Sequence, residues 1–196
     1  MNPPLLFATH NSGKLREVRE ILGEWIPIRG LDEEGIHLEI PEPHPTLEQN
    51  ARKKCRGIHE GTGRDCFAED TGLFVSSLDG DPGVRSARYA GPSCNSRDNI
   101  RKLLQELKGC SLRQARFSTV IVLYWKGKEY QFEGSVEGKI AEEPRGEGGF
   151  GYDPVFLPDG GEGRTFAQMS TNEKNRFSHR AIAFEHLKQF LLKCPD

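Results

Sequence analysis

The chain has 196 residues, of which 35% are hydrophobic and 29% charged, a composition typical of a folded soluble protein. Its formal net charge of -2 excludes a broad nucleic-acid-binding surface. No apolar run approaches the roughly 18 residues that a membrane span needs, and the first residues lack the charged start and long apolar stretch of a signal peptide.

The number and spacing of the cysteines indicate the redox compartment of the protein. Their number, five, is odd, and no two of them have CxxC spacing. This pattern argues against a disulfide framework and against a zinc site. We therefore expect a protein of the reducing cytoplasm.

The first third of the chain alternates strand and helix patterns. Short apolar runs predict strands, apolar residues at helical spacing predict a first helix, and a capping-box pair predicts the start of a second helix. The expected elements are a strand over 5–8, a helix carrying Leu15, Val18, Ile21 and Leu22, a helix opened by Thr46 and Gln49 that ends near Gly61, and a strand over 66–68.

The rest of the chain continues the mixture without an internal repeat or a linker. It predicts a helix over 100–107 stopped by Gly109, a hairpin of strands 115–125 and 129–140, a strand over 155–157, a short helix opened by Ser170 and Glu173, and a longer helix from about Ser178. This order favours a single α/β domain over residues 1–196 with a mixed sheet.

The run from Gly148 to Pro154 is the most unusual stretch of the sequence. Three glycines surround Phe150, and Tyr152 and Asp153 follow. Glycine lets a backbone bend sharply and approach a ligand closely. The loop therefore predicts a grip on a flat, polar ring.

Thr9 to Lys14 lies between the first strand and the first helix. Backbone N–H groups at a helix start, together with a hydroxyl, an amide and a lysine, are suited to hold phosphate. The spacing is not that of a P-loop. The alternative is an ordinary strand-to-helix turn with Asn11 or Ser12 as N-cap.

Acidic residues form a second candidate site. Glu69 and Asp70 are expected to end a strand, with Thr71-Gly72 as a turn that lets both carboxylates meet one Mg²⁺ ion. The alternative is a solvated acidic turn. Two prolines flank Glu42 and pre-set its direction, although this segment taken alone favours a plain surface loop. Lys54 borders an apolar stripe, from which it can reach either solvent or a phosphate.

Positive charge gathers near the C-terminal helix. Lys174, Arg176, His179 and Arg180 lie at the junction of two helices, and cations at a helix N-terminus oppose its dipole. An anion or an acceptor on a ligand would resolve that conflict. The alternative is a solvated basic edge that faces Glu173 or Glu185.

The ordered set of these motifs resembles the inosine/xanthosine triphosphate pyrophosphatases, which hydrolyse non-canonical purine nucleotides. The resemblance covers nearly the whole chain. Its carriers are Ala8–Lys14, Ala68–Leu73, Pro82-Gly83, Ser86–Gly91, Gly149–Pro154, Glu173–Asn175 and Ser178–Arg180. It implies an α/β fold with a long, bent mixed sheet flanked by helices, two lobes around a central cleft, and a homodimer.

The resemblance also implies roles for individual residues. Glu42, Glu69 and Asp70 would hold Mg²⁺, with Asp70 as the general base. The substrate would be bound by Thr9, His10, Asn11, Ser12, Gly13, Lys14, Lys54, Thr71, Phe150, Gly151, Tyr152, Asp153, Lys174, His179 and Arg180. Within this set, Phe150 would stack on the base.

The implied reaction is hydrolysis of ITP, dITP or XTP between the α and β phosphates, giving a monophosphate and pyrophosphate. Donors such as His179 and Arg180 would favour a 6-oxo purine over adenine, because an unpaired buried polar group costs about 1–3 kcal/mol. Two alternatives stay open. One is a pyrophosphatase for another altered nucleotide, and the other is a nucleotide sensor without turnover.

Overall fold

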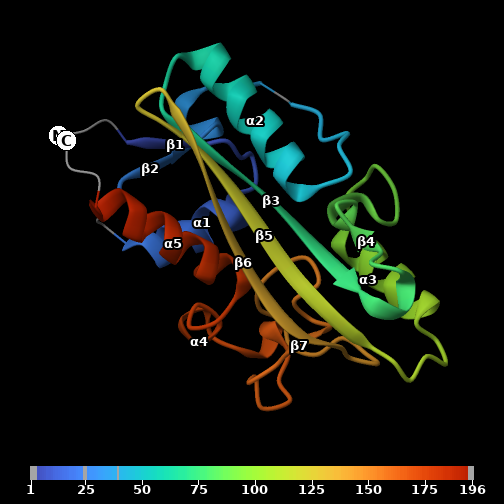
Figure 1. Cartoon of the computed structure of the whole chain (residues 1–196). Helices are drawn as coiled ribbons and strands as arrows, with labels where there is room; N and C mark the ends of the chain where they lie inside the picture. The colour runs from blue at the N-terminus through green and yellow to red at the C-terminus, as the bar shows by residue number, and fades with distance from the viewer. Residues whose placement is uncertain (1–3, 24–25, 39, 194–196) are drawn as a thin grey trace. The chain divides into compact units, whose positions relative to one another are not determined.

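The computed structural model describes residues 4–23, 26–38 and 40–193. Figure 1 follows the chain from its N-terminus to its C-terminus. The strands are β1 (Leu5–Phe7), β2 (Ile28–Gly30), β3 (Cys66–Val75), β4 (Pro82–Gly83), β5 (Gln114–Trp125), β6 (Lys128–Ile140) and β7 (Phe156–Pro158). The helices are α1 (Ser12–Leu22), α2 (Leu47–Thr62), α3 (Ser96–Glu106), α4 (Thr171–Lys174) and α5 (His179–Lys193), with short 3₁₀ turns at η2 (Asp32–Glu34), η3 (Ser76–Leu78), η4 (Ser86–Arg88) and η5 (Phe166–Gln168).

The strands form one seven-stranded mixed sheet in the order β2-β1-β3-β5-β6-β7, with β4 paired to β3. β1 runs parallel to β2 and β3, whereas β4 and β7 are antiparallel to their partners. This confirms the expected mixed α/β fold. In the part of the chain that is described, no helix is both long and apolar enough to cross a membrane.

The chain divides into two compact units. Unit 1 comprises Met1–Asp70, Thr119–Gly134 and Arg180–Asp196, and unit 2 comprises Thr71–Ser118 and Ser135–His179. The expected single domain and the expected cleft stay predictions, and each unit is described by itself.

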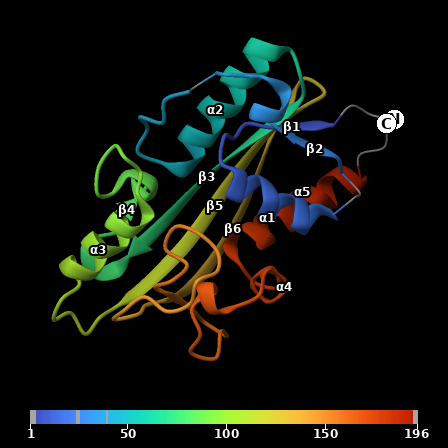
Figure 2. The same cartoon turned by 180° about the vertical axis from the view of Figure 1, so that it is seen from behind.

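Strict alternation along the strands gives unit 1 two cores. Phe7 and Phe67, which pair in register and stack with ring centroids 4.5 Å apart, pack with α1 and α5 residues such as Val18 and Phe184. The even-numbered residues of β1, β3 and β5, such as Leu6, Cys66 and Val122, pack instead with the α2 residues Ala51, Cys55 and Ile58. In Figures 1 and 2, α1 and α5 accordingly lie together on one side of β1 and β3, with α2 on the other.

The second helix begins where the sequence predicts. The Thr46 hydroxyl accepts the N–H of Gln49, and the helix ends at Thr62 with Gly63 in the left-handed region. Two further glycines, Gly57 and Gly61, lie inside this helix. Each costs a helix interior about 1 kcal/mol relative to alanine, so α2 carries a local cost that its packing must offset.

Unit 2 has one core around the second half of β3. Leu73 and Val75 belong to one cluster with Leu103 of α3, Phe117 of β5 and Phe156 of β7. The short helix α4 has the predicted capping box: the Ser170 hydroxyl accepts the N–H of Glu173, whose carboxylate accepts the N–H of Ser170. Figure 2 shows α3 and β4 together, apart from α4, which lies at the other end of this unit.

One sequence expectation about the sheet is wrong. β3 does not end at Glu69 and Asp70 but runs on through Thr71 and Gly72 to Val75. The pairing of Leu73 and Phe74 with β4 extends the strand, and Gly72 lies so close to the backbone of Gly83 that a side chain would not fit there. A glycine that reads as a turn signal in the sequence here permits a close strand contact.

Candidate active site

The turn from Thr9 to Asn11 is a self-supporting loop at the start of α1. The Thr9 hydroxyl accepts the N–H of Asn11 at 3.1 Å, and the Asn11 side chain accepts the N–H of Lys14 at 3.0 Å. Asn11 is therefore the N-cap, as one of the two readings of the sequence proposes. Ser12 and Gly13 form the first turn of the helix, where N–H groups have no partner within the helix. A phosphate role for this turn stays a prediction.

Glu69 is the centre of a buried ion network on the α1 and α5 side of β3. Its carboxylate lies 3.1 Å from Nζ of Lys14 and accepts hydrogen bonds from Nε and Nη2 of Arg180 at 3.0–3.2 Å. Arg180 also donates through Nη1 to Glu17 at 2.7 Å. Burial alone raises the pKa of Glu69, but the charges of Arg180 and Lys14 outweigh it and lower that pKa to about 2. Glu69 is therefore a fixed anion.

Asp70 lies on the opposite face of β3, toward α2. It is only 6% exposed, and Nδ2 of Asn50 donates to its Oδ2 at 3.3 Å. Burial and then the like charge of Glu42 raise the pKa of Asp70 to about 6, against the opposing effect of Lys54, Lys14 and the Asn50 amide. A carboxylate with such a pKa can take up a proton near neutral pH, as a general base must.

Glu42 reaches the same side of unit 1 from the proline-flanked segment. Its carboxylate pairs with Nζ of Lys54 on α2, and both side chains are partly buried. Lys54 therefore does not simply extend into solvent, which was one of the two readings of the sequence. The acidic residues at 69 and 70 are likewise not a solvated turn, because both are buried.

The carboxylates can be tested against the Mg²⁺ ion that the resemblance implies. The described residues hold no group of three or more His, Cys, Asp or Glu side chains placed to bind one metal ion. Glu69 is engaged by Arg180 and Lys14, whereas Asp70 and Glu42 repel each other. A hard cation would relieve that repulsion, and Mg²⁺ is commonly held by one or two carboxylates together with substrate phosphates. Asp70 and Glu42 thus fit such an ion better than Glu69 does.

The glycine-rich loop in unit 2 packs mainly against the protein itself. A side chain at Gly146 or Gly148 would overlap or crowd the carbonyl of Ala167 in η5, and one at Gly149 would overlap the carboxylate of Asp153. At Gly151, by contrast, nothing lies within 4 Å of where a side chain would start. The glycines that the sequence assigns to ligand approach therefore largely serve the anchoring of the loop.

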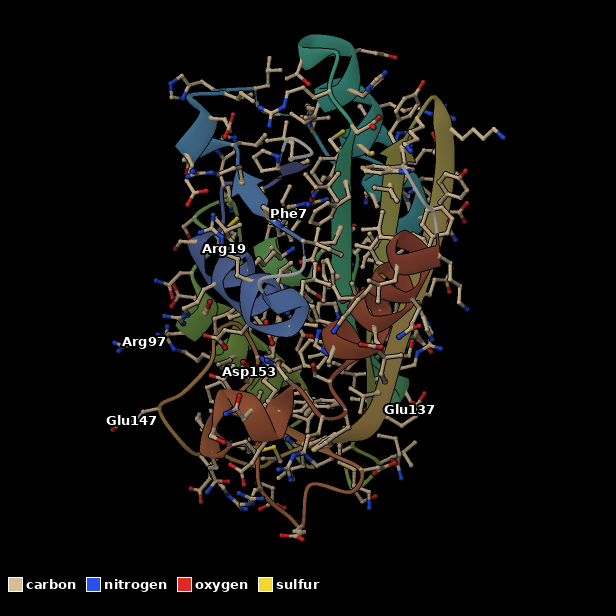
Figure 3. The ribbon with its side chains drawn as sticks, turned by 90° about the vertical axis from the view of Figure 1, so that its left-hand side faces the viewer. Phe7, Arg19, Arg97, Glu137, Glu147 and Asp153 are labelled. Atoms are coloured by element: carbon tan, nitrogen blue, oxygen red, sulfur yellow. The ribbon has the colours of Figure 1, made fainter. Side chains whose placement is uncertain are left out.

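Asp153 is the anchor of this loop. It is 3% exposed, and its Oδ2 accepts the N–H of Phe150 at 2.9 Å and a hydrogen bond from Nζ of Lys174 at 2.8 Å. That same Nζ lies 5.2 Å from the centre of the Phe150 ring. In Figure 3 Asp153 lies inside this unit, whereas Glu147 projects outward from the same loop. Phe150 is half-buried. Asp153 holds its backbone N–H, and the Lys174 ammonium lies against its ring.

Tyr152 and His179 are buried in unit 2. The Tyr152 hydroxyl donates to the carbonyl of Ser86 at 2.9 Å, and the ring is 4% exposed. The His179 ring stacks on Phe117 with centroids 4.6 Å apart. Thr71 is half-buried at the start of this unit's part of β3. Direct substrate contacts by these residues stay predictions.

The expected basic cluster is not a shared solvated edge. Lys174 is paired with Asp153, His179 is stacked on Phe117, and Arg180 is paired with Glu69 and Glu17. Each of these three residues is at most 5% exposed. Lys174, His179 and Arg180 therefore have separate buried partners, and Arg176 is the exposed residue among the four.

Two polar residues of the site were missed in the sequence. Asn50 bridges Asp70 and both backbone polar groups of His44, with hydrogen bonds of 2.9–3.3 Å, and Glu17 holds Arg180. Helical spacing carries the signal for both. Asn50 precedes Lys54 by four residues and Glu17 follows Lys14 by three, so each shares a helix face with a predicted site residue.

Comparisons with known proteins cover nearly the whole chain. A family model described as the Ham1 family matches residues 5–190. A dITP/XTP pyrophosphatase of Porphyromonas gingivalis is 50% identical over 189 residues, which span 96% of this chain and 97% of that protein. One from Bacillus subtilis is 43% identical over 190 residues, 95% of this chain and 96% of its own length.

Solved structures agree with this assignment. A HAM1 protein from Coxiella burnetii superposes with a TM-score of 0.88 at 36% identity, covering 98% of this chain and all of that one. The seven-stranded mixed sheet, the Asp70 site and the anchored glycine-rich loop thus occur in a chain that belongs to the Ham1 family.

Proposed function

We propose that the protein is a Mg²⁺-dependent nucleoside triphosphate pyrophosphatase that converts dITP, ITP and XTP to the monophosphate and pyrophosphate. The full-length similarity to proteins named dITP/XTP pyrophosphatase supports this activity. The observation that carries the chemistry is Asp70, a buried carboxylate whose pKa of about 6 reflects burial and the nearby Glu42 charge.

Asp70 is the proposed general base. At neutral pH the Asp70 carboxyl group is mostly ionised. One of its oxygens can therefore accept a proton from water as the water attacks phosphorus. The Asn50 amide holds Oδ2 at 3.3 Å and so orients the carboxylate. Positioned proton transfer of this kind contributes typically about 10²–10⁴-fold to rate.

The phosphates are assigned to cations and N–H groups of unit 1. A nucleoside triphosphate carries about four negative charges that must be offset before phosphorus accepts a nucleophile. Lys14 and Lys54 are the proposed ligands, with the turn of Thr9, Asn11, Ser12 and Gly13. Glu69 fixes Nζ of Lys14 at 3.1 Å, which supports a rigid cradle.

Mg²⁺ would be held by Asp70 and Glu42 together with phosphate oxygens. Bound there, the ion would neutralise phosphate charge and polarise the P–O bonds. The protein's own part is to keep two carboxylates and Lys54 in place. Glu69 is proposed to act on this site only through Lys14 and Arg180.

The base is assigned to Phe150, with Gly151, Tyr152, Asp153, Lys174 and His179 around it. Phe150 is the proposed stacking surface, because Asp153 and Lys174 hold its backbone and flank its ring. All three guanidinium nitrogens of Arg180 already donate to Glu69 or Glu17. A contact with the base edge would need an additional N–H of the same group. We infer that holding Glu69 is its main role.

A single assay tests the activity against both alternatives. Purified protein is incubated with Mg²⁺ and each of ITP, dITP, XTP, GTP, ATP and a modified pyrimidine triphosphate, and pyrophosphate and orthophosphate are measured separately. We expect pyrophosphate as first product from the three deaminated purines. Orthophosphate first would overturn α–β cleavage. Tight ITP binding without any product would favour the sensor, and a preference for the pyrimidine would favour the other pyrophosphatase.

Oligomeric state and location belong to the same proposal. The family resemblance supports a homodimer, and cysteine usage supports the cytoplasm. Light scattering after size exclusion should give twice the mass of the chain, 22.0 kDa. A monomer across the working concentration range would contradict the dimer.

A further inference from the structure

Two glycines on one face of α2 are occupied by side chains from another segment. Gly57 and Gly61 are four residues apart, so they lie above one another on the helix. A side chain at Gly57 would overlap Cδ1 of Ile40, and the first carbon of one at Gly61 would lie 2.6 Å from Cδ1 of Leu38. The missing side chains thus make a groove that receives Ile40 and Leu38.

The next turn of the helix continues the same series of contacts. Lys54, three residues before Gly57, pairs with Glu42, two residues after Ile40. Gly61, Gly57 and Lys54 follow one another at spacings of four and three residues, about 6 and 4.5 Å along the helix. Leu38, Ile40 and Glu42 thus contact Gly61, Gly57 and Lys54, respectively, along one face of α2. We call these three α2 positions the α2 groove.

His10 holds the far end of this series. Its Nδ1 lies 2.5 Å from Oδ1 of Asp32, and its Nε2 lies 3.2 Å from the carbonyl oxygen of Leu38. His10 belongs to the Thr9–Lys14 turn and thereby ties Leu38 to that turn.

We propose that Gly57 and Gly61, together with His10, are positioning residues that place Glu42 beside Lys54 for Mg²⁺ and phosphate binding. This inference rests on the proposed function of Glu42. A bulky side chain at position 57 would push Ile40 away from the helix and would carry Glu42 off Lys54. His10 would then act by holding Leu38 rather than by touching the nucleotide.

The test compares the full chain with four variants. Gly57→Leu fills the groove with a residue that favours helix, and Glu60→Leu places the same side chain on an exposed position of the same helix. Ile40→Ala combined with Gly57→Leu makes room again, and Glu42→Gln removes the charge. Two quantities are measured: the Mg²⁺ concentration for half-maximal ITP hydrolysis, and amide hydrogen exchange of residues 36–46 without nucleotide.

Gly57→Leu should need about tenfold more Mg²⁺, as supporting residues of metal sites typically do when changed. It should match Glu42→Gln in this respect, speed exchange over residues 36–46 and leave the melting temperature no lower. The double variant should return toward wild type in both measurements. Glu60→Leu should not differ from wild type in either.

Wild-type exchange and Mg²⁺ requirement in Gly57→Leu would overturn the positioning role. So would an effect that Ile40→Ala does not rescue and that comes with a lower melting temperature, because that is general destabilisation. Failure of the proposed function looks different: the unmodified protein releases no pyrophosphate, while the exchange experiment still tests the groove. A wild-type Mg²⁺ requirement in Glu42→Gln would overturn the placement of Glu42 for metal and leave pyrophosphate release unaffected.

Discussion

Glu69 and Asp70 are neighbours on β3, yet their carboxylates have pKa values of about 2 and about 6. The strand continues through both residues, so their side chains point to opposite faces. Glu69 meets Arg180 and Lys14, whereas Asp70 meets Asn50 in an environment where burial and Glu42 outweigh the lysines. One dipeptide thus supplies a permanent anion on one face and a proton acceptor on the other.

Asp70→Asn should stabilise the metal-free protein at pH 8 while removing activity. The pKa of Asp70 is raised from its ordinary 3.8 to about 6, so the folded state disfavours the charged form. Two pKa units correspond to at most about 3 kcal/mol, gained by the variant above pH 6 and absent below about pH 4. Urea unfolding in EDTA at pH 8 and pH 3.5 measures this difference. A difference in unfolding free energy between variant and wild type that is the same at both pH values would contradict the assignment. Retained turnover in the variant would contradict it as well.

The rate should fall as the pH drops through the pKa of Asp70. A general base must be ionised, so kcat/KM for ITP should lose activity below about pH 6 in the free enzyme. Glu42→Gln removes a like charge that raises this pKa, so the acid limb should move to lower pH. A limb that stays in place in Glu42→Gln would mean that another group controls it. Glu48→Gln, at a partly exposed position of α2, is the control.

Glu69→Gln should destabilise the protein strongly. The change leaves Arg180, which is 2% exposed, with less compensation of its charge, and breaking a buried pair costs about 3–5 kcal/mol. Because the pKa of Glu69 is lowered to about 2, its contribution is complete above about pH 4.5 and is lost as pH falls toward 2. Arg101→Ala breaks the exposed pair with Asp98 and should cost under about 1 kcal/mol. Similar losses in the two variants would contradict a structural ion network at Glu69.

The fold was predictable where local pattern and tertiary packing agree. Apolar spacing predicts α1 and α5, and Thr46 and Ser170 cap their helices as the sequence indicates. β3 was predicted too short, because Thr71-Gly72 has the composition of a turn. Its continuation depends on the pairing with β4, a contact between residues that local sequence does not connect.

The site divides in the same way. The residue types at Lys14, Lys54, Glu42 and Asp70 predict phosphate and metal binding. Their pairing does not follow from the sequence, since Glu69 is bound by Arg180, 111 positions away. The sequence assigns the glycines near Phe150 to close approach of a ligand, whereas in the structure Gly148 and Gly149 approach Ala167 and Asp153.

Tyr152→Phe should weaken the base site without removing a substrate contact. Its hydroxyl donates to the Ser86 carbonyl at 2.9 Å, and the Ser86 hydroxyl in turn accepts the N–H of Leu73 at 2.8 Å. Losing the first bond should cost about 1 kcal/mol of unfolding free energy and raise KM for ITP more than it lowers kcat. Tyr130→Phe, whose ring packs on Phe190, is the control. Unchanged stability and unchanged KM would show that the loop does not depend on Tyr152.

Phe150→Ala should raise KM for ITP and XTP with a smaller effect on kcat. Base stacking on an aromatic side chain is worth about 1–3 kcal/mol, which corresponds to roughly 5- to 140-fold in KM at about 1.4 kcal/mol per decade. The ring is half-buried, and its backbone N–H stays bonded to Asp153 in the variant, so unfolding free energy should change little. Phe150→Trp keeps a stacking surface and should retain affinity, and Glu147→Ala, in an outward-pointing position of the same loop (Figure 3), should behave as wild type. If Phe150→Ala keeps the wild-type KM, the base is held elsewhere and the loop serves only the structure of unit 2.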